Sequence, residues 1–238
     1  MSFVLPRWIA HRGGGVLAPE NTLAGIRLAA AMGFRAVEFD VMLSADGTPV
    51  LIHDETLERT TNGQGRVCET GDDVLFTLDA GNGEPIPHFI EAARVCRALG
   101  LLANIEIKPA AGHELATAEK VARLAAEIWY DAPGQVLISS FVPEAVEVAR
   151  DLAPALPRSL LFEVVPAEWP ELFTHMRATA LHCDADLLSD DVLRQAALLG
   201  VPVVCYTVNN PATAQALINR GVSAFFTDRL DLFAVQAG

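Results

Sequence analysis

Short runs of β-branched and other apolar residues alternate with helical patterns along almost the whole chain, and this alternation restricts the fold most. Strands joined by helices are parallel, because a crossover connection returns the chain to the same edge of the sheet. We therefore expect a closed (β/α)8 TIM barrel. The alternative is an open doubly wound sheet, but no Gly-x-Gly-x-x-Gly motif follows a strand. The expected strands cover residues 8–11, 36–43, 102–107, 136–140, 158–162, 178–183, 201–207 and 223–227.

Helix boundaries between these strands carry signals of their own. A helix is expected over residues 22–32, after a proline. Pro143 and Pro211 stand where a first helical turn would begin, since the N–H that proline lacks has no helical partner there. A glycine of the kind that ends helices follows four of the helical patterns: Gly33, Gly100, Gly200 and Gly221. These signals agree with the barrel interpretation.

Length and charge set the class of protein. The 238 residues suit one barrel, so we expect a single domain over residues 1–238. The net charge of −13 repels a phosphate backbone, which predicts no nucleic-acid partner. The longest apolar stretch, residues 196–208, is shorter than the roughly 20 residues of a membrane span. With no leader-like apolar region at the start, we expect a cytoplasmic protein without stable membrane insertion. The sequence leaves the oligomeric state open.

One region interrupts the alternation after the second strand. A tight turn at Asp46-Gly47 leads into a short strand near residues 50–52. Residues 55–87 are then polar and rich in glycine, with no clear period. A stretch of about 30 irregular residues inside a compact domain is either functional or disordered. We expect an insertion over the barrel mouth.

Two carboxylates share one face of the second strand. In AVEFDVML, Glu38 and Asp40 alternate with apolar residues, so both side chains point the same way, about 6.7 Å apart along the strand. At an effective dielectric constant near 20 their repulsion is about 2–3 kcal/mol. In NIEIKP, Glu106 and Lys108 likewise share a face. Three converging carboxylates are the ligand set that a hard divalent ion such as Mg²⁺ prefers.

Four polar segments end predicted strands, and together they suggest chemistry on a phosphate ester. Besides the two carboxylate segments, these are His11-Arg12-Gly13 and His53-Asp54. Two histidines suit general acid–base catalysis at neutral pH. Arg12 offers a bidentate fork for a phosphate and Lys108 a point charge. Taken singly, each segment has an ordinary structural reading, such as an exposed strand face or a lysine that only neutralises a carboxylate. If all four segments were only structural, the protein would bury charged groups in at least three separate places without a function for them, which is energetically costly.

Six segments carry a more specific pattern: IAHRGGGVLAPENTLAGI, VEFDVMLSADGTPVLIHDETLERTTNGQG, ANIEIKP, LISSF, YTVNNP and FTDRLD. In these segments the chain resembles the glycerophosphodiester phosphodiesterases, and among them the cytoplasmic bacterial enzymes. The resemblance extends from Ile9 to Asp231. Two positions depart from the pattern of many members, namely Tyr206 in place of Trp and Leu230 in place of Pro.

The resemblance implies a metal-dependent hydrolysis of glycerophosphodiesters to sn-glycerol 3-phosphate and an alcohol, within lipid and glycerol metabolism. It implies that His11 accepts a proton, that His53 donates one to the departing alcohol, and that Arg12 and Lys108 bind the phosphate. The glycerol 2-hydroxyl would attack the phosphorus, giving a cyclic phosphate that water then opens. One divalent ion is implied, which we expect to be Mg²⁺ with Mn²⁺ or Ca²⁺ as alternatives. Its ligands would be Glu38, Asp40 and Glu106.

Two other functions stay open at this stage. One is a lysophospholipase D-type activity on lysolipids, which would need an exposed apolar groove near Leu75, Phe76 and Phe89. The other is a barrel of the same fold that binds a phosphate ligand without turnover. For neighbouring residues the sequence also leaves alternatives. Glu20 and Asn21 organise the first loop or contact the site, and Asp54 orients His53 or caps a turn. The pocket roles of Glu163, His182 and Tyr206 are not decided.

Overall fold

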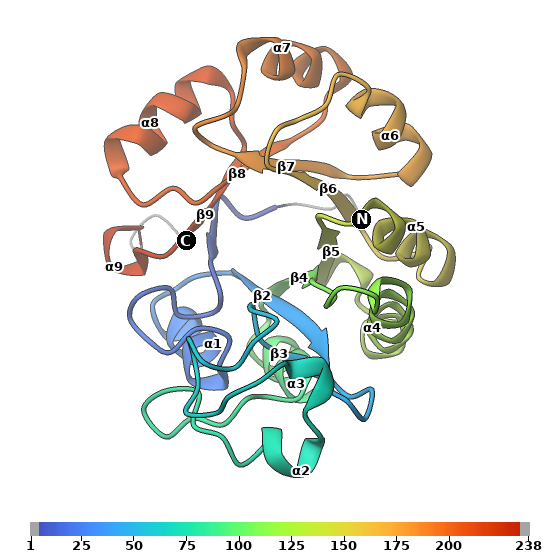
Figure 1. The fold of residues 1–238 in the computed structure, drawn as a ribbon. Coiled ribbons are helices and arrows are strands. Elements are labelled where there is room, and N and C mark those ends of the chain that lie inside the picture. Colours follow the sequence, from blue (N-terminus) through green and yellow to red (C-terminus); the bar gives the residue numbers. More distant parts are fainter. Residues whose placement is uncertain (1–4, 234–238) are drawn as a thin grey trace.

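The apolar runs form a closed barrel in the computed structural model, which describes residues 5–233 (Figure 1). Eight parallel strands pair in the order β1-β2-β4-β5-β6-β7-β8-β9, and β9 pairs again with β1. This closure excludes the open doubly wound sheet and confirms the (β/α)8 barrel. The strands are β1 (Trp8–Ala10), β2 (Ala36–Leu43), β3 (Pro49–Leu51), β4 (Leu102–Ile107), β5 (Val136–Ser140), β6 (Arg158–Phe162), β7 (Ala180–Asp184), β8 (Val203–Tyr206) and β9 (Ala224–Thr227).

Helices surround the ring of strands (Figure 1). The α-helices are α1 (Leu23–Ala31), α2 (Asp72–Leu75), α3 (Phe89–Leu99), α4 (Glu114–Ile128), α5 (Pro143–Leu152), α6 (Trp169–Met176), α7 (Asp190–Leu199), α8 (Pro211–Arg220) and α9 (Leu230–Phe233). Two 3-10 turns are η1 (Val67–Glu69) and η2 (Pro133–Gln135). The Thr22 side chain caps α1, and Pro143 and Pro211 open α5 and α8 as predicted. None of the helices within the described residues is long and apolar enough to cross a membrane.

Two predicted strand boundaries were wrong by two residues. The sixth barrel strand, β7, begins at Ala180 and not at residue 178, because the N–H of Ala178 closes the end of α6 by bonding to Phe173 O. The seventh barrel strand, β8, begins at Val203 and not at residue 201. There the N–H of Val201 bonds back to α7, and Pro202 has no N–H to pair. Neither shift moves a residue of the predicted site.

Strand alternation divides the interior into two parts. On β2, the side chains of Val37, Phe39 and Val41 pack outward in the main core beneath the helices, while Glu38 and Asp40 face the inside of the barrel. A separate inner cluster of apolar side chains fills the barrel interior. It comprises Ile9, Ala36, Leu102, Leu137, Ala180, Val204, Ala224 and Phe226. Polar groups thus stand above an apolar plug, at the carboxyl ends of the strands where barrel enzymes place their sites.

The 55–87 segment, which lies between β3 and α3, builds a small core of its own. β2 is longer than its neighbours and pairs antiparallel with β3, which carries the chain away from the barrel. Apolar side chains of this segment cover Met42 and Val50 at that extension. The buried members from the segment are Leu57, Val67, Cys68, Leu75 and Ile86. All four cysteines of the chain are buried and free.

Candidate active site

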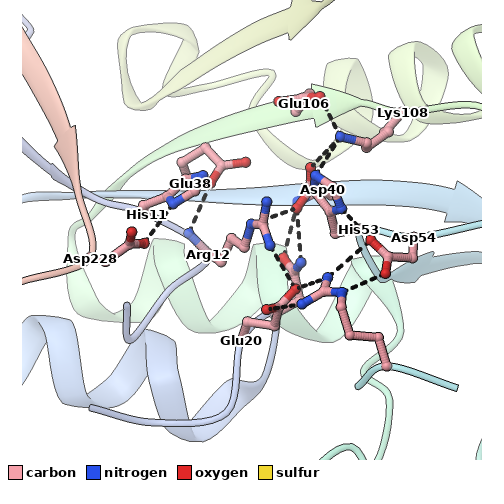
Figure 2. Close-up of polar contacts among 12 residues, drawn as sticks. His11, Arg12, Glu20, Glu38, Asp40, His53, Asp54, Glu106, Lys108 and Asp228 are labelled. Atoms are coloured by element: carbon pink, nitrogen blue, oxygen red, sulfur yellow. Dashed lines mark hydrogen bonds and ion pairs between the residues drawn. The ribbon is translucent and has the colours of Figure 1, made fainter. Parts of the chain in front are cut away.

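A cavity of about 220 Å³ opens at the carboxyl ends of the barrel strands. All seven residues singled out in the sequence line it: His11, Arg12, Glu38, Asp40, His53, Glu106 and Lys108. Figure 2 shows them converging from separate strands and loops. Polar groups that are far apart in the chain therefore form one site.

Strand pairing explains why the three carboxylates meet. Asp40 of β2 and Glu106 of β4 are register partners on adjacent strands, so their side chains lie next to each other. Glu38 lies two residues before Asp40 on the same face. One oxygen from each of the three carboxylates lies within 4.8 Å of the others. The expectation that these groups end their strand was wrong for β2, because that strand continues to Leu43 to pair with β3.

The energetics of this group favour a bound cation. Burial and the charge of Asp40 raise the pKa of Glu106 to about 8. Burial, and then the charges of Asp40 and Glu106, raise the pKa of Glu38 well above its usual range. Oε1 of Glu38 and Oε1 of Glu106 are buried without a hydrogen-bond partner. Unpaired buried carboxylate oxygens are costly in the absence of a cation, and an all-oxygen set suits a hard divalent ion, so these three residues fit a metal site.

Arg12 and Lys108 supply positive charge on either side of Asp40. Arg12 Nε lies 3.8 Å from Asp40 Oδ2, and Lys108 Nζ lies 3.8 Å from Asp40 Oδ1. Lys108 Nζ also lies 3.6 Å from Glu106 Oε1. These distances exceed those of direct hydrogen bonds, so both cations retain donors for an anionic ligand in the cavity.

His11 follows β1 and is held by a carboxylate from the opposite end of the sequence. Its Nδ1 lies 2.7 Å from Asp228 Oδ1, and Asn209 Nδ2 donates to the other oxygen of Asp228 at 3.0 Å. Burial opposes ionisation of Asp228, yet the bonds from His11 and Asn209 keep its pKa below the usual value. An ionised carboxylate only accepts, so the proton of neutral His11 sits on Nδ1. Nε2, which lies 3.9 Å from Glu38 Oε2, is then free to accept a proton.

His53 has the same type of support. Its Nδ1 lies 2.6 Å from Asp54 Oδ1, and its Nε2 lies 2.6 Å from Lys108 Nζ. Burial lowers the pKa of His53, with the Lys108 charge acting in the same direction and the carboxylates opposing it. In this arrangement the Lys108 ammonium donates to Nε2. Of the two alternatives for Asp54, the geometry favours the one in which it orients His53.

The loop between β1 and α1 brings backbone and side chains close to the carboxylates. Arg12 and Asn21 both adopt left-handed backbone angles, with φ of 50° and 57°. The Arg12 N–H donates to Glu38 Oε2 at 2.9 Å, and the Asn21 amide both donates to Asp40 Oδ2 and accepts from the Asp40 N–H. A Cβ on Gly15 would lie 2.2 Å from Asp228 O, so only glycine lets this loop reach Asp228. Asn21 therefore organises the loop and contacts the site as well.

The floor and wall of the cavity differ in polarity. Asn104, Ser139 and His182 form a buried polar floor. Complete burial lowers the pKa of His182 to about 3, so this imidazole is neutral. Phe141 and Tyr206 line the wall, with ring centroids 5.9 Å apart, and the Tyr206 hydroxyl donates to Phe162 O. Glu163 is exposed and does not line the cavity.

Two contacts were missed in the sequence. Asp228 lies in the FTDRLD segment, directly after the last strand, and that position was an available signal. Arg59 bonds to both Asp54 and Glu20, and nothing in its local pattern marks it. Long-range pairing of this kind has no periodicity that a single sequence displays.

The fold and this site define a (β/α)8-barrel enzyme in which three carboxylates able to hold a metal lie beside two histidines. The model of the glycerophosphoryl diester phosphodiesterase family matches residues 11–232. The chain belongs to that family, whose members are phosphoric diester hydrolases.

Individual relatives cover nearly all of the chain. The glycerophosphodiester phosphodiesterase of Caldanaerobacter subterraneus is 33% identical, over 92% of this chain and 93% of the relative. A solved structure of an Oleispira antarctica phosphodiesterase, in complex with the product sn-glycerol-3-phosphate, superposes with a TM-score of 0.90 at 35% identity. It covers 98% of this chain and 97% of that chain. A glycerophosphodiester phosphodiesterase from Agrobacterium tumefaciens superposes with a TM-score of 0.81 at 28% identity, covering 97% of this chain and 100% of that chain.

Proposed function

We propose that this enzyme hydrolyses small water-soluble glycerophosphodiesters, such as glycerophosphocholine and glycerophosphoethanolamine, to sn-glycerol 3-phosphate and an alcohol. The observation that carries the proposal is the convergence of three carboxylates, two carboxylate-supported imidazoles and two cations on one cavity. The Oleispira relative, bound to sn-glycerol-3-phosphate, supports the choice of substrate.

Glu38, Asp40 and Glu106 would hold one divalent ion, for which we propose Mg²⁺, with Mn²⁺ and Ca²⁺ as alternatives. Carboxylate oxygens accept all three ions, and cellular availability selects among them. When bound, the ion would supply positive charge to the phosphoryl oxygens. The unpaired oxygens of Glu38 and Glu106 support this assignment.

His11 would act as the proton acceptor in the first half-reaction. Because Asp228 holds the proton on Nδ1, Nε2 is positioned to take the proton of the glycerol 2-hydroxyl. That hydroxyl attacks the phosphorus of the same molecule, forming a cyclic phosphate and releasing the alcohol. An intramolecular attack needs no second reactant to be positioned, which lowers its entropic cost.

His53 would donate the proton that the departing alkoxide requires. In the free enzyme its Nε2 accepts from Lys108 and carries no proton of its own. A bound phosphate would draw the Lys108 ammonium away, and Nε2 would then take up a proton from solvent, which it gives to the leaving oxygen. Arg12 and Lys108 would bind the equatorial oxygens as negative charge develops. In the second half-reaction the histidines exchange roles, and water opens the cyclic phosphate.

The direct test mixes the purified protein with glycerophosphoethanolamine and Mg²⁺, Mn²⁺ or Ca²⁺ in turn and measures sn-glycerol 3-phosphate. Absence of product with every ion contradicts the proposal. Tight binding of glycerol 3-phosphate without turnover would support a binding barrel instead. Higher activity on a lysolipid would support the lysophospholipase D alternative. The apolar groove that this alternative needs is not formed by Leu75 and Phe89, which are buried.

A further inference from the structure

Seven charged or polar side chains in and beside the cavity form a closed ring in which acidic groups alternate with basic ones, except where Lys108 meets His53. Starting at His53, each contacts the next within 4 Å, and the last returns to the first. The order is His53, Asp54, Arg59, Glu20, Arg12, Asp40 and Lys108. Figure 2 shows most of this ring. The mechanism above uses His53, Arg12, Asp40 and Lys108, and it gives Arg59 no role.

Arg59 is the member of the ring that the 55–87 segment contributes. Its Nε and Nη2 donate to the two oxygens of Asp54, at 2.5 and 3.0 Å. Its Nη1 and Nη2 donate to the two oxygens of Glu20, both at 2.8 Å. One guanidinium thus engages two carboxylates, each through both oxygens. Only the planar fork of arginine has donors arranged for such contacts.

Each carboxylate that Arg59 holds supports a group that would act on the substrate. Asp54 accepts from Nδ1 of His53, and Glu20 accepts from Nη1 of Arg12 at 2.9 Å. Arg59 itself does not line the cavity. Without Arg59, Asp54 and Glu20 would both lose their anchor to the 55–87 segment, and the side chains they support would gain rotational freedom.

We propose that Arg59 is a positioning residue that couples the proton donor His53 to the phosphate-binding Arg12. It fixes these two groups relative to each other through Asp54 and Glu20. The proposal rests on the proposed function, because it assigns His53 to leaving-group protonation and Arg12 to phosphate binding. It also gives the 55–87 segment a part in catalysis beyond covering Met42 and Val50.

The test compares two substrates that differ only in the leaving group. Glycerophosphoethanolamine releases a strongly basic alkoxide that needs a proton, whereas glycerol 3-(4-nitrophenyl) phosphate releases a stable phenolate that does not. Both substrates give the same cyclic phosphate, whose opening also uses His53, so the readout is the single-turnover rate of leaving-group release. For Arg59→Met we expect the rate of ethanolamine release to fall about 10- to 100-fold, as for other supporting partners, and the rate of nitrophenolate release to fall far less. KM should rise for both substrates, because the hold on Arg12 loosens.

Arg66 provides a matched control in the same segment. Its side chain is similarly exposed (41%, against 45% for Arg59), and it bonds to Glu55 at 2.7 Å, away from the cavity. Arg66→Met should leave the ratio of the two release rates unchanged. Equal effects of the two substitutions on that ratio would overturn the proposal, since they would report a general loosening of the segment.

Two further variants separate the possible failures. If His53→Ala slows the release of both leaving groups equally, the proposed role of His53 is refuted. If His53→Ala slows ethanolamine release more than nitrophenolate release but Arg59→Met does not, only the role of Arg59 is refuted. Combining Arg59→Met with Asp54→Asn should cost no more kcat than Asp54→Asn alone, and multiplied losses would contradict the coupling. If Arg59→Met does not stay folded, Arg59→Lys takes its place. It should show a smaller loss of the same kind, larger on glycerophosphoethanolamine than on the nitrophenyl ester. Equal losses on both substrates overturn the proposal.

Discussion

His11 and Asp228 lie 217 residues apart in the chain, yet His11 Nδ1 is only 2.7 Å from Asp228 Oδ1. The contact forms because β1 and β9 are neighbours that close the barrel, and both residues follow the ends of these strands. Asn209 holds Asp228 from its other side. The chain thus uses the closure of its fold to orient one of its two histidines.

Replacing Asp228 with Asn should lower kcat at least about tenfold. The fall in kcat should not exceed the roughly 10²–10⁴-fold that a general base contributes to the rate. An amide no longer compels His11 to keep its proton on Nδ1, so Nε2 is free less often. KM should change little, because Asp228 does not line the cavity. Steady-state kinetics on glycerophosphoethanolamine measure both constants. Asp231→Asn, which removes a carboxylate that contacts Arg229, is the control and should leave kcat unchanged.

Removing the metal should abolish turnover, and Glu106→Gln should weaken metal binding. Excess EDTA is expected to stop product formation, and adding back a divalent ion should restore it. Glu106→Gln removes one of three carboxylate charges without changing the size of the side chain. Isothermal titration calorimetry should give one ion per chain for the parent protein. Glu163→Gln, at an exposed position outside the cavity, should bind like the parent. Unaltered affinity in Glu106→Gln would remove that residue from the ligand set.

The stability of the metal-free protein should fall as pH rises from about 4.5 to about 8. The folded state raises the pKa of Glu106 from 4.5 to about 8, so it binds this proton more tightly than the unfolded chain does. That contribution is fully present below pH 4.5 and is lost by pH 8. A divalent ion binds the ionised carboxylates, so the gain in Tm on adding Mg²⁺ should grow over this range. Thermal unfolding with EDTA or Mg²⁺ tests this, and a gain independent of pH contradicts it.

His182 should take no part in proton transfer. Its pKa of about 3 keeps the imidazole neutral across the working range, and its Nε2 has no partner. His182→Gln should therefore leave the shape of the pH–rate profile unchanged between about pH 5 and 9. Its unfolding free energy should fall by about 1–3 kcal/mol, because the buried contact with Ser159 is altered. Loss of a limb of the profile would assign His182 to the mechanism.

Arg158 should matter for stability and not for activity. It is 3% exposed, and its guanidinium donates to five backbone carbonyls at the amino end of β6, away from the cavity. These are the carbonyls of Ala153, Pro154, Leu156, Met176 and Arg177. Arg158→Met leaves buried acceptors unpaired at about 1–3 kcal/mol each. We expect a clear fall in the denaturation midpoint at unchanged kcat of the folded protein. A drop in kcat without a stability loss would contradict this role.

Much of the barrel and all seven predicted site residues followed from local patterns. Alternation placed Glu38 and Asp40 on one face of β2, because side chains of a strand change sides at every residue. The helix starts at Pro143 and Pro211 followed from the geometry of a single residue. In contrast, the start of β7 at Ala180 depended on how α6 ends, which is a contact between elements.

The sequence by itself determined the class of fold and the chemical groups of the site, because periodicity and residue type act over a few neighbouring positions. Tertiary structure decided which groups touch. The register of β2 against β4 sets Asp40 beside Glu106, barrel closure sets His11 beside Asp228, and the path of the 55–87 segment sets Arg59 between Asp54 and Glu20. Such contacts join positions tens to hundreds of residues apart, so they exist only once the whole chain has packed.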